Sequence, residues 1–302
     1  MNKDLKRGVL LASITAIMWG FLAVALKVSL DFASAGTTVW FRFAFSFVAL
    51  LLFMLRREPA KVVAVLRRPP LLGVLASLGL ASNYVGYMHG VALTGPSNTQ
   101  VIIQLGPLLL IVVGAVAFDE RMRLAQLVGL GVAALGFGLF YYDQLRLLWA
   151  SAGNFNTGNA WILFAAVAWT LYGALQKHLV HLWDPRQVNL VLYGVAAILI
   201  FPLCNFHEFV HMSLGTWVLL ALLALNTLVA YGALAEAFKL APANVISVII
   251  TVNPIITVVS MAILGAMHVS WIAPEAISWR GYVGATLALA GVARVVSAKS
   301  TT

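Results

Sequence analysis

Long apolar stretches, separated by short polar segments, fill almost the whole chain. Each stretch is close to the roughly 20 residues that an α-helix needs to cross a bilayer. The longest breaks between the first six stretches are the loop 55–70 and the segment 142–158. The pattern predicts an all-α polytopic membrane protein with ten transmembrane helices and no room for a soluble domain. The ten windows are 8–29, 37–55, 71–92, 96–117, 124–141, 158–177, 188–204, 215–238, 242–264 and 280–297.

Composition agrees with this pattern. Of the 302 residues, 62% are hydrophobic and only 10% are charged, whereas a soluble domain carries about 25% charged residues. The net charge of +9 does not indicate nucleic-acid binding, because the basic residues are spread along short loops and not gathered on one face. The first apolar run, 8–26, is longer than the roughly 7–15 residues of a signal peptide, so we expect a first membrane helix there. The single cysteine, Cys204, excludes an internal disulfide framework.

The loop charges predict an orientation. Helices that alternate in direction place fifteen of the 19 lysines and arginines on one side of the membrane. Only Arg146 and Arg280 fall on the other side, while Lys27 and Arg42 lie within spans. Cytoplasmic loops carry an excess of Lys and Arg. We therefore expect both termini in the cytoplasm.

The two halves of the chain resemble each other. Five spans is an odd number, so a second copy of a five-span unit enters the membrane from the opposite side. The sequence therefore predicts two inverted five-helix repeats, residues 1–150 and 151–302, that form one transport unit. The matching positions are Trp19 with Trp169, Lys27 with Lys177, Tyr84 with Tyr231, Pro107 with Pro254, Gly129 with Gly284 and Gly136 with Gly291.

A proline lies inside one apolar span of each half, at Pro107 and Pro254. Proline removes a backbone donor, which leaves the carbonyls of Ile103 and Ile250 without their usual partner. Paired breaks in corresponding spans indicate the substrate site of a transporter, and they make the two prolines candidate hinges for gating. The alternative is that both kinks are only packing devices, since prolines are tolerated in membrane helices.

Polar and aromatic residues gather near the middle of several spans. Amides are costly in hydrocarbon unless they have partners, so these residues face one another or a cavity. We expect a cavity lined by spans one, three, four, six, eight and nine, with spans five and ten as outer scaffold. The alternative is that the amides only join helices to one another. The candidate substrate-binding residues are Trp19, Asn83, Tyr87, Gln100, Gln104, Trp169, Tyr172, Asn226 and Asn253.

Charged groups are few within the spans. Arg42 begins the second span on the outer side, where it could bind a substrate carboxylate at the mouth of the cavity. No Asp, Glu, Lys or Arg lies at mid-depth, so the predicted cavity suits neutral or zwitterionic solutes. Proton-driven transport normally needs an acid within the membrane. His89 could titrate instead, and both facilitated and proton-coupled transport remain open.

One short motif indicates a different class of protein. The run from His207 through Glu208, Phe209 and Val210 to His211 fits the H-E-x-x-H pattern of zinc metalloproteases. It lies in a brief outer loop without a long helix to present it, and His268 is its only outer candidate for a third ligand. A membrane metalloprotease is therefore a remote alternative, and no metal site is predicted.

These marks together resemble a known family. The ten spans in two repeats, Trp19, the two proline helices, the Asp119-Glu120-Arg121 turn and the glycine pairs are similar to the EamA-type members of the drug/metabolite transporter superfamily. Within this family, the sequence is similar to the YddG-type aromatic amino-acid exporters of bacterial inner membranes. The second half departs from the pattern, because Met267-His268 stands where the family often repeats an acidic–basic turn.

The resemblance implies a transporter and not an enzyme. It implies export of amino acids, aromatic and other neutral ones, or of similar small metabolites, by alternating access across the bacterial inner membrane. Its partners would be a small-molecule solute and the lipid bilayer, with no cofactor and no nucleic acid, and a monomer is compatible with it. The alternative within the superfamily is a proton-coupled multidrug exporter or an exporter of another metabolite.

Overall fold

The computed structural model describes residues 3–120, 122–140, 142, 154–269 and 278–297. Arg121, Arg146 and Lys299, on which the charge distribution partly rests, lie outside these residues.

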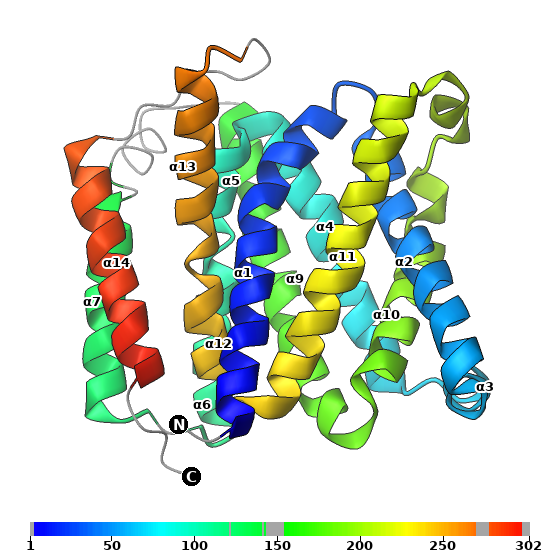
Figure 1. Cartoon of the computed structure of the whole chain (residues 1–302), viewed down its shortest axis with the longest axis horizontal. Helices are drawn as coiled ribbons and strands as arrows, with labels where there is room; N and C mark the ends of the chain where they lie inside the picture. Colours follow the sequence, from blue (N-terminus) through cyan, green and yellow to red (C-terminus); the bar gives the residue numbers. More distant parts are fainter. Residues whose placement is uncertain (1–2, 121, 141, 143–153, 270–277, 298–302) are drawn as a thin grey trace.

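The described residues form a bundle of long helices that run side by side (Figure 1). The helices are α1 (Lys3–Ser29), α2 (Ala35–Arg57), α3 (Pro59–Arg67), α4 (Leu71–Thr94), α5 (Pro96–Ile102), α6 (Leu105–Ala117), α7 (Leu124–Phe140), α9 (Asn154–Leu182), α10 (Pro185–Ile200), the 3-10 helices η1 (Phe201–Leu203) and η2 (Phe206–His211), α11 (Leu214–Leu240), α12 (Ala243–Ile250), α13 (Asn253–Ala266) and α14 (Trp279–Ser297).

Eight stretches of helix in the described part of the chain are long and apolar enough to cross a membrane. They comprise α1, α2, α4, α9, α10 with η1, α11, and the two pairs α5–α6 and α12–α13. The 17-residue α7 is a shorter apolar helix, and the 19-residue α14 is not among the eight. The predicted helical membrane protein is thus confirmed, while the count of ten spans stays a prediction.

The helices pack in pairs. α4 lies against α9, α1 against α11, and α2 against α10, while α7 and α14 form a separate pair at one edge of the bundle (Figure 1). The main core cluster draws its buried side chains from α1, α2, α4, α6 and α9 to α12. The broken pairs α5–α6 and α12–α13 contact α1 and α9 inside the bundle.

Both spans that contain the paired prolines are interrupted. α5 ends at Ile102 and α6 begins at Leu105, whereas α12 ends at Ile250 and α13 begins at Asn253. The Ile103 carbonyl, which cannot accept from its usual donor position at Pro107, accepts a hydrogen bond from the Gly106 backbone nitrogen instead (2.9 Å). A tighter turn thus replaces the bond that Pro107 cannot make.

The segment 55–70, expected to be a loop, contains a helix. α3 begins with Pro59, whose missing N–H is harmless in a first turn. Its buried Val62 and Val65 pack with Met54 of α2 and Leu190 of α10. The two valines, one turn apart, give α3 an apolar face that the length of the segment alone did not reveal.

The pair α7–α14 depends on backbone contact through glycines. A Cβ atom on Gly136 would overlap the backbone nitrogen of Ala288 and lie 2.8 Å from the Gly284 carbonyl oxygen. Gly284 and Gly291 on α14 face α7 equally closely. Small residues allow such close approach between helices in a membrane. Gly138 lies two residues further along the same helix, and a Cβ atom added to it would have no atom within 4 Å.

We therefore expect Gly136→Ala to destabilise the protein by about 1–3 kcal/mol, as overpacked cores do. Gly138→Ala, a matched change on the same helix, should leave stability unchanged or slightly raised, since alanine favours helix. Thermal unfolding of the purified variants in detergent measures both. Equal melting temperatures for the two variants would contradict the close approach of α7 and α14.

Candidate functional site

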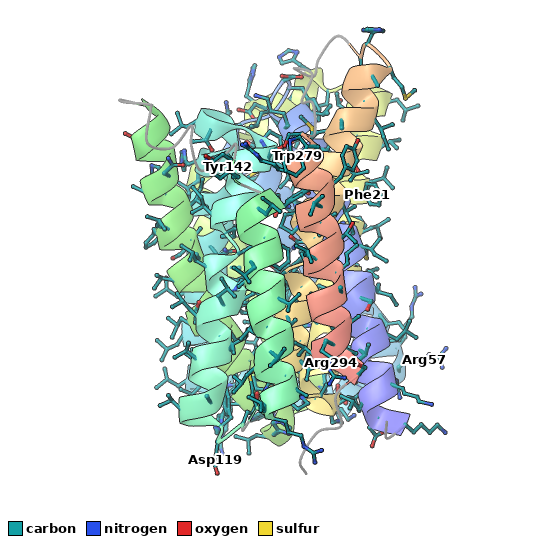
Figure 2. All side chains as sticks on the ribbon, turned by 90° about the vertical axis from the view of Figure 1, so that its left-hand side faces the viewer. Phe21, Arg57, Asp119, Tyr142, Trp279 and Arg294 are labelled. Atoms are coloured by element: carbon teal, nitrogen blue, oxygen red, sulfur yellow. The ribbon has the colours of Figure 1, made fainter. Side chains whose placement is uncertain are left out.

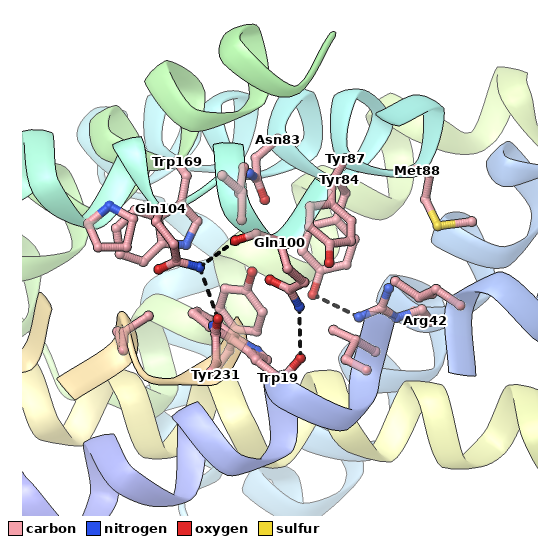
Figure 3. Close-up of a pocket in the computed structure, with 16 residues that line it drawn as sticks. Trp19, Arg42, Asn83, Tyr84, Tyr87, Met88, Gln100, Gln104, Trp169 and Tyr231 are labelled. Carbon is pink, nitrogen blue, oxygen red and sulfur yellow. Dashed lines mark hydrogen bonds between the residues drawn. The ribbon is translucent and has the colours of Figure 1, made fainter. Parts of the chain in front are cut away.

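A cavity of about 60 Å³ lies where the broken helices meet α1, α4, α9 and α11 (Figure 3). A buried water needs at least about 10–15 Å³, so the cavity has room for a few waters, and a larger solute requires the helices to move apart. The residues that line the cavity are Trp19, Leu22, Leu26, Arg42, Asn83, Tyr84, Tyr87, Met88, Gln100, Ile103, Gln104, Pro107, Trp169, Tyr231, Ile250 and Asn253.

Most of the predicted site residues come together here. The lining includes Trp19, Asn83, Tyr87, Gln100, Gln104, Trp169 and Asn253, and also the predicted hinge residue Pro107. Pro254 stands next to the lining residue Asn253 and does not itself line the cavity.

Tyr172 and Asn226 lie elsewhere. The Tyr172 ring is fully buried behind the lining, against the rings of Trp169 and Tyr231. Asn226 donates from Nδ2 to the Met18 carbonyl oxygen (2.9 Å) and joins α11 to α1. The prediction for Asn226 rests on its depth along the span, and that for Tyr172 on its helical spacing from Trp169. Neither criterion determines which neighbours pack around the helix.

The amide groups both line the cavity and join helices. Gln104 Nε2 donates to Asn253 Oδ1 (2.9 Å) and to the Gln100 carbonyl oxygen (3.0 Å), which connects the two breaks (Figure 3). Gln100 Nε2 donates to the Trp19 carbonyl oxygen (3.1 Å), and Asn83 Nδ2 donates to the Ala165 carbonyl oxygen (2.9 Å). The same amide residues therefore line the cavity and join helices to one another, so the two alternatives do not exclude each other.

Two polar atoms of the lining have no partner among the described residues. They are the Tyr87 hydroxyl and Gln104 Oε1, both buried. Leaving a buried donor or acceptor unsatisfied costs about 1–3 kcal/mol. A solute or water in the cavity would supply the missing hydrogen bonds.

Aromatic rings form one wall of the cavity. Trp19 packs edge-on against Trp169, with ring centroids 6.2 Å apart. It also packs at a tilt against Tyr231, with ring centroids 5.1 Å apart. Tyr84 in turn lies 5.8 Å from Tyr231. Sequence reasoning used Tyr84 and Tyr231 only as a repeated pair, although their equal spacing to the two prolines already tied them to the site.

Arg42 is the main difference from the sequence expectation. Its side chain is only 1% exposed and lines the cavity, not an outer mouth. Nε donates to Thr227 Oγ1 (2.9 Å), Nη2 donates to the Tyr84 hydroxyl (3.3 Å), and the guanidinium carbon lies 4.6 Å from the centre of the Tyr84 ring. Arg42 follows the first residue of α2, Ala35, by seven positions, which is about 10 Å along a helix. The cavity thus carries one fixed positive charge.

A polar cluster closes the bundle at the end from which α1 starts. Glu120 accepts from the backbone nitrogens of Ala243 (2.8 Å) and Asn244 (3.0 Å) and so caps α12. Lys177 Nζ donates to the carbonyl oxygens of Phe238 (2.8 Å) and Ala241 (2.7 Å) and lies 3.9 Å from Glu120 Oε1. Sequence reasoning used Glu120 and Lys177 only as family and repeat marks. We call this set the Glu120–Lys177 cluster.

Replacing Glu120 by alanine removes the carboxylate that accepts from the two backbone amides of α12 and lies beside the Lys177 ammonium. Because hydrogen bonds to a charged group each contribute about 1.5–3 kcal/mol, we expect an apparent melting temperature several degrees lower. The control is Glu58→Ala, which removes exposed ion pairs with Lys61 and Arg186 that contribute about 1 kcal/mol or less. Equal shifts for the two variants, measured in the same detergent, would show that the cluster is not structural.

His89 lies outside the cavity lining and stacks on Trp161, with ring centroids 4.9 Å apart.

The H-E-x-x-H segment forms the short helix η2. Glu208 Oε2 accepts from the Ser34 backbone nitrogen (2.9 Å) before α2, and the rings of His207 and His211 lie 4.9 Å apart. Among the described residues no group of three or more His, Cys, Asp or Glu is placed to hold a metal ion. The glutamate therefore connects η2 to the start of α2, and the geometry gives the metalloprotease alternative no support.

A helical membrane bundle whose two broken helices meet at a small polar and aromatic cavity has the architecture of a solute transporter. The chain belongs to the EamA-like transporter family, which matches residues 6–142 and again residues 156–297.

Relatives with this architecture occur in several organisms. The inner membrane transporter YhbE of Escherichia coli, described as uncharacterized, is 32% identical over 96% of this chain and 91% of its own length. An uncharacterized transporter of Haemophilus influenzae is 28% identical over 94% of this chain and 92% of its own. A crystal structure with 18% identity superposes with a TM-score of 0.74, covering 95% of this chain and 96% of that one. At that identity the superposition shows the fold alone.

Proposed function

We propose that the protein exports amino acids, aromatic and other neutral ones, or similar small metabolites, across the bacterial inner membrane. The cavity carries this proposal. It combines flat aromatic faces with the unpartnered Tyr87 hydroxyl and Gln104 Oε1, at the junction of both broken helices. Solute pockets are mostly apolar, with a few placed polar groups. The inner-membrane relatives support the location, and the resemblance to YddG-type exporters supports the substrate class.

Paired helix contacts support ten spans in two inverted repeats, 1–150 and 151–302. When the halves are exchanged, the contact of α1 with α11 becomes that of α9 with α4, α1 with α13 becomes α9 with α6, and α2 with α11 becomes α10 with α4; all six contacts are present. Gly8 near the start of α1 and Lys177 near the end of α9 both contact Ala241. The two helices therefore run in opposite directions, as inversion requires.

Alternating access has a candidate gate at one end of the cavity. There Glu120 of the first half accepts from the start of α12, and Lys177 of α9 donates to the end of α11; opening there requires these bonds to break. The breaks before Pro107 and Pro254 would let the inner half-helices tilt.

The direction of insertion follows from the two ends of the bundle. α1 begins and α14 ends at the same end (Figure 1). Figure 2 shows Arg57 and Arg294 at that end, and the aromatic residues Tyr142 and Trp279 at the other. The positive-inside rule then supports cytoplasmic termini.

Proton coupling has less support than facilitated exchange. The described lining contains no Asp, Glu or His, and intramembrane acids or histidines are the usual proton relays. The proton-coupled multidrug alternative would require a titrating group outside this cavity.

Counterflow in proteoliposomes tests the proposal. Vesicles preloaded with an unlabelled neutral amino acid should take up the labelled form, with Phe, Tyr, Trp and Leu as the panel. Trp19→Ala should reduce the rate by about tenfold or more, because an aromatic wall residue contributes 1.5–3 kcal/mol of burial. Trp279→Ala removes an exposed tryptophan far from the cavity and should exchange at the wild-type rate. Failure of all four amino acids would overturn the amino-acid assignment, and equal rates in the two variants would overturn the cavity assignment.

A further inference from the structure

The guanidinium of Arg42 is a buried charge without a counter-ion. Among the described residues no Asp or Glu forms an ion pair with Arg42, and none lines the cavity. Its hydrogen-bond partners in the described chain, Thr227 and Tyr84, are neutral hydroxyls reached from Nε and Nη2. Nη1 has no protein acceptor among the described residues, so part of the guanidinium fork is available. An ionised side chain within a membrane normally pairs with an opposite charge or marks a substrate path.

We infer that Arg42 binds a carboxylate of the transported solute, an assignment that rests on the proposed function and names the charge its substrate must carry. The guanidinium fork matches the geometry of a carboxylate, and such charge-assisted bonds are about twice as strong as neutral ones. The buried Tyr87 hydroxyl, unpartnered in the same lining, is a second donor for the same anion.

The opposite charge on a solute has no comparable partner. The lining offers an ammonium group only neutral acceptors, such as Gln104 Oε1, and aromatic faces. In Figure 3 Gln104 and Arg42 lie at opposite sides of the cavity, with Gln100 between them. A group that binds at Gln104 is therefore separate from the one at Arg42. The carboxylate is required and the ammonium is dispensable, so the substrate class extends from zwitterionic amino acids to monocarboxylates with a compact apolar body.

A structural role for Arg42 makes a different prediction. If the arginine served only to hold α2 to α4 and α11, removing its Thr227 partner would disturb the cavity as much as removing the charge. If Arg42 binds the solute, the charge matters and the single neutral partner matters little. Thr227→Val, which keeps the shape of the side chain and loses the hydroxyl, separates the two.

Binding to the purified wild-type chain, measured by isothermal titration, tests the inference. Three phenyl compounds are compared, which carry both a carboxylate and an ammonium group, only the carboxylate, or only the ammonium. L-phenylalanine and 3-phenylpropionate should bind, and 2-phenylethylamine should bind about 10- to 100-fold more weakly, the factor expected for one lost charge-assisted interaction. Equal or tighter binding of the amine would overturn the inference, and so would the absence of binding by both carboxylates.

Variants then assign the effect to the residue. Arg42→Gln should abolish the preference for carboxylates, Arg42→Lys should weaken binding but keep the order of the three compounds, and Thr227→Val should keep both order and affinity within about threefold. Retained preference in a folded Arg42→Gln protein would overturn the inference. If that variant does not fold, the wild-type series and Arg42→Lys still decide it.

This experiment fails separately from the transport assay. Carboxylate binding without amino-acid counterflow would remove the proposed export of amino acids and leave the Arg42 site in place. Amino-acid counterflow together with equal binding of the amine would remove the Arg42 site and leave the proposed export of amino acids in place.

Discussion

The hydrogen bond from Gln104 to Asn253 joins the two places where a membrane helix is interrupted. In hydrocarbon every backbone polar group must find a partner within the protein, so a broken helix is tolerated only where other protein groups surround it. The structure brings both breaks to one place, between α1 and α9, and joins them through the side-chain amides of Gln104 and Asn253. The cavity exists because two interruptions share one polar environment. Its position at the centre of the bundle follows from that constraint.

The charges of the bundle are placed according to the same principle. Glu120 and Lys177, near one end, lie beside each other and bond to the free backbone groups at the end of α11 and the start of α12. Arg42, within the cavity, has hydroxyl partners but no acid. One cluster is complete within the protein, and the other would be completed by the carboxylate that we propose for the solute. That difference separates the part of the molecule that holds it closed from the part that recognises the solute.

Much of this could be predicted from the sequence, and the failures have a common cause. Apolar windows of membrane length predicted the helices, and the paired prolines predicted both breaks, because these features depend on chain order alone. Depth along a span placed Trp19, Gln104 and Asn253 correctly in the lining. Neither depth nor helical spacing could place Asn226 and Tyr172, whose direction around the helix depends on which neighbours pack there.

Long side chains and short helices were the other source of error. The Arg42 side chain reaches inward from a helix start that the sequence assigned to the outer surface. Contacts between distant segments, such as Glu120 with the start of α12, leave no local trace in the sequence. The helix α3 is recognised only when Val62 and Val65 have a surface to pack against.

A double-mutant cycle on Gln104 and Asn253 tests most directly whether the two breaks depend on each other. Gln104→Leu and Asn253→Leu, alone and together, would be compared by the free energy of unfolding in mixed micelles. The structure predicts a coupling energy of about 1 kcal/mol, within the range measured for hydrogen bonds between membrane helices. Effects that add within about 0.3 kcal/mol would contradict it, because the breaks would then be stabilised independently.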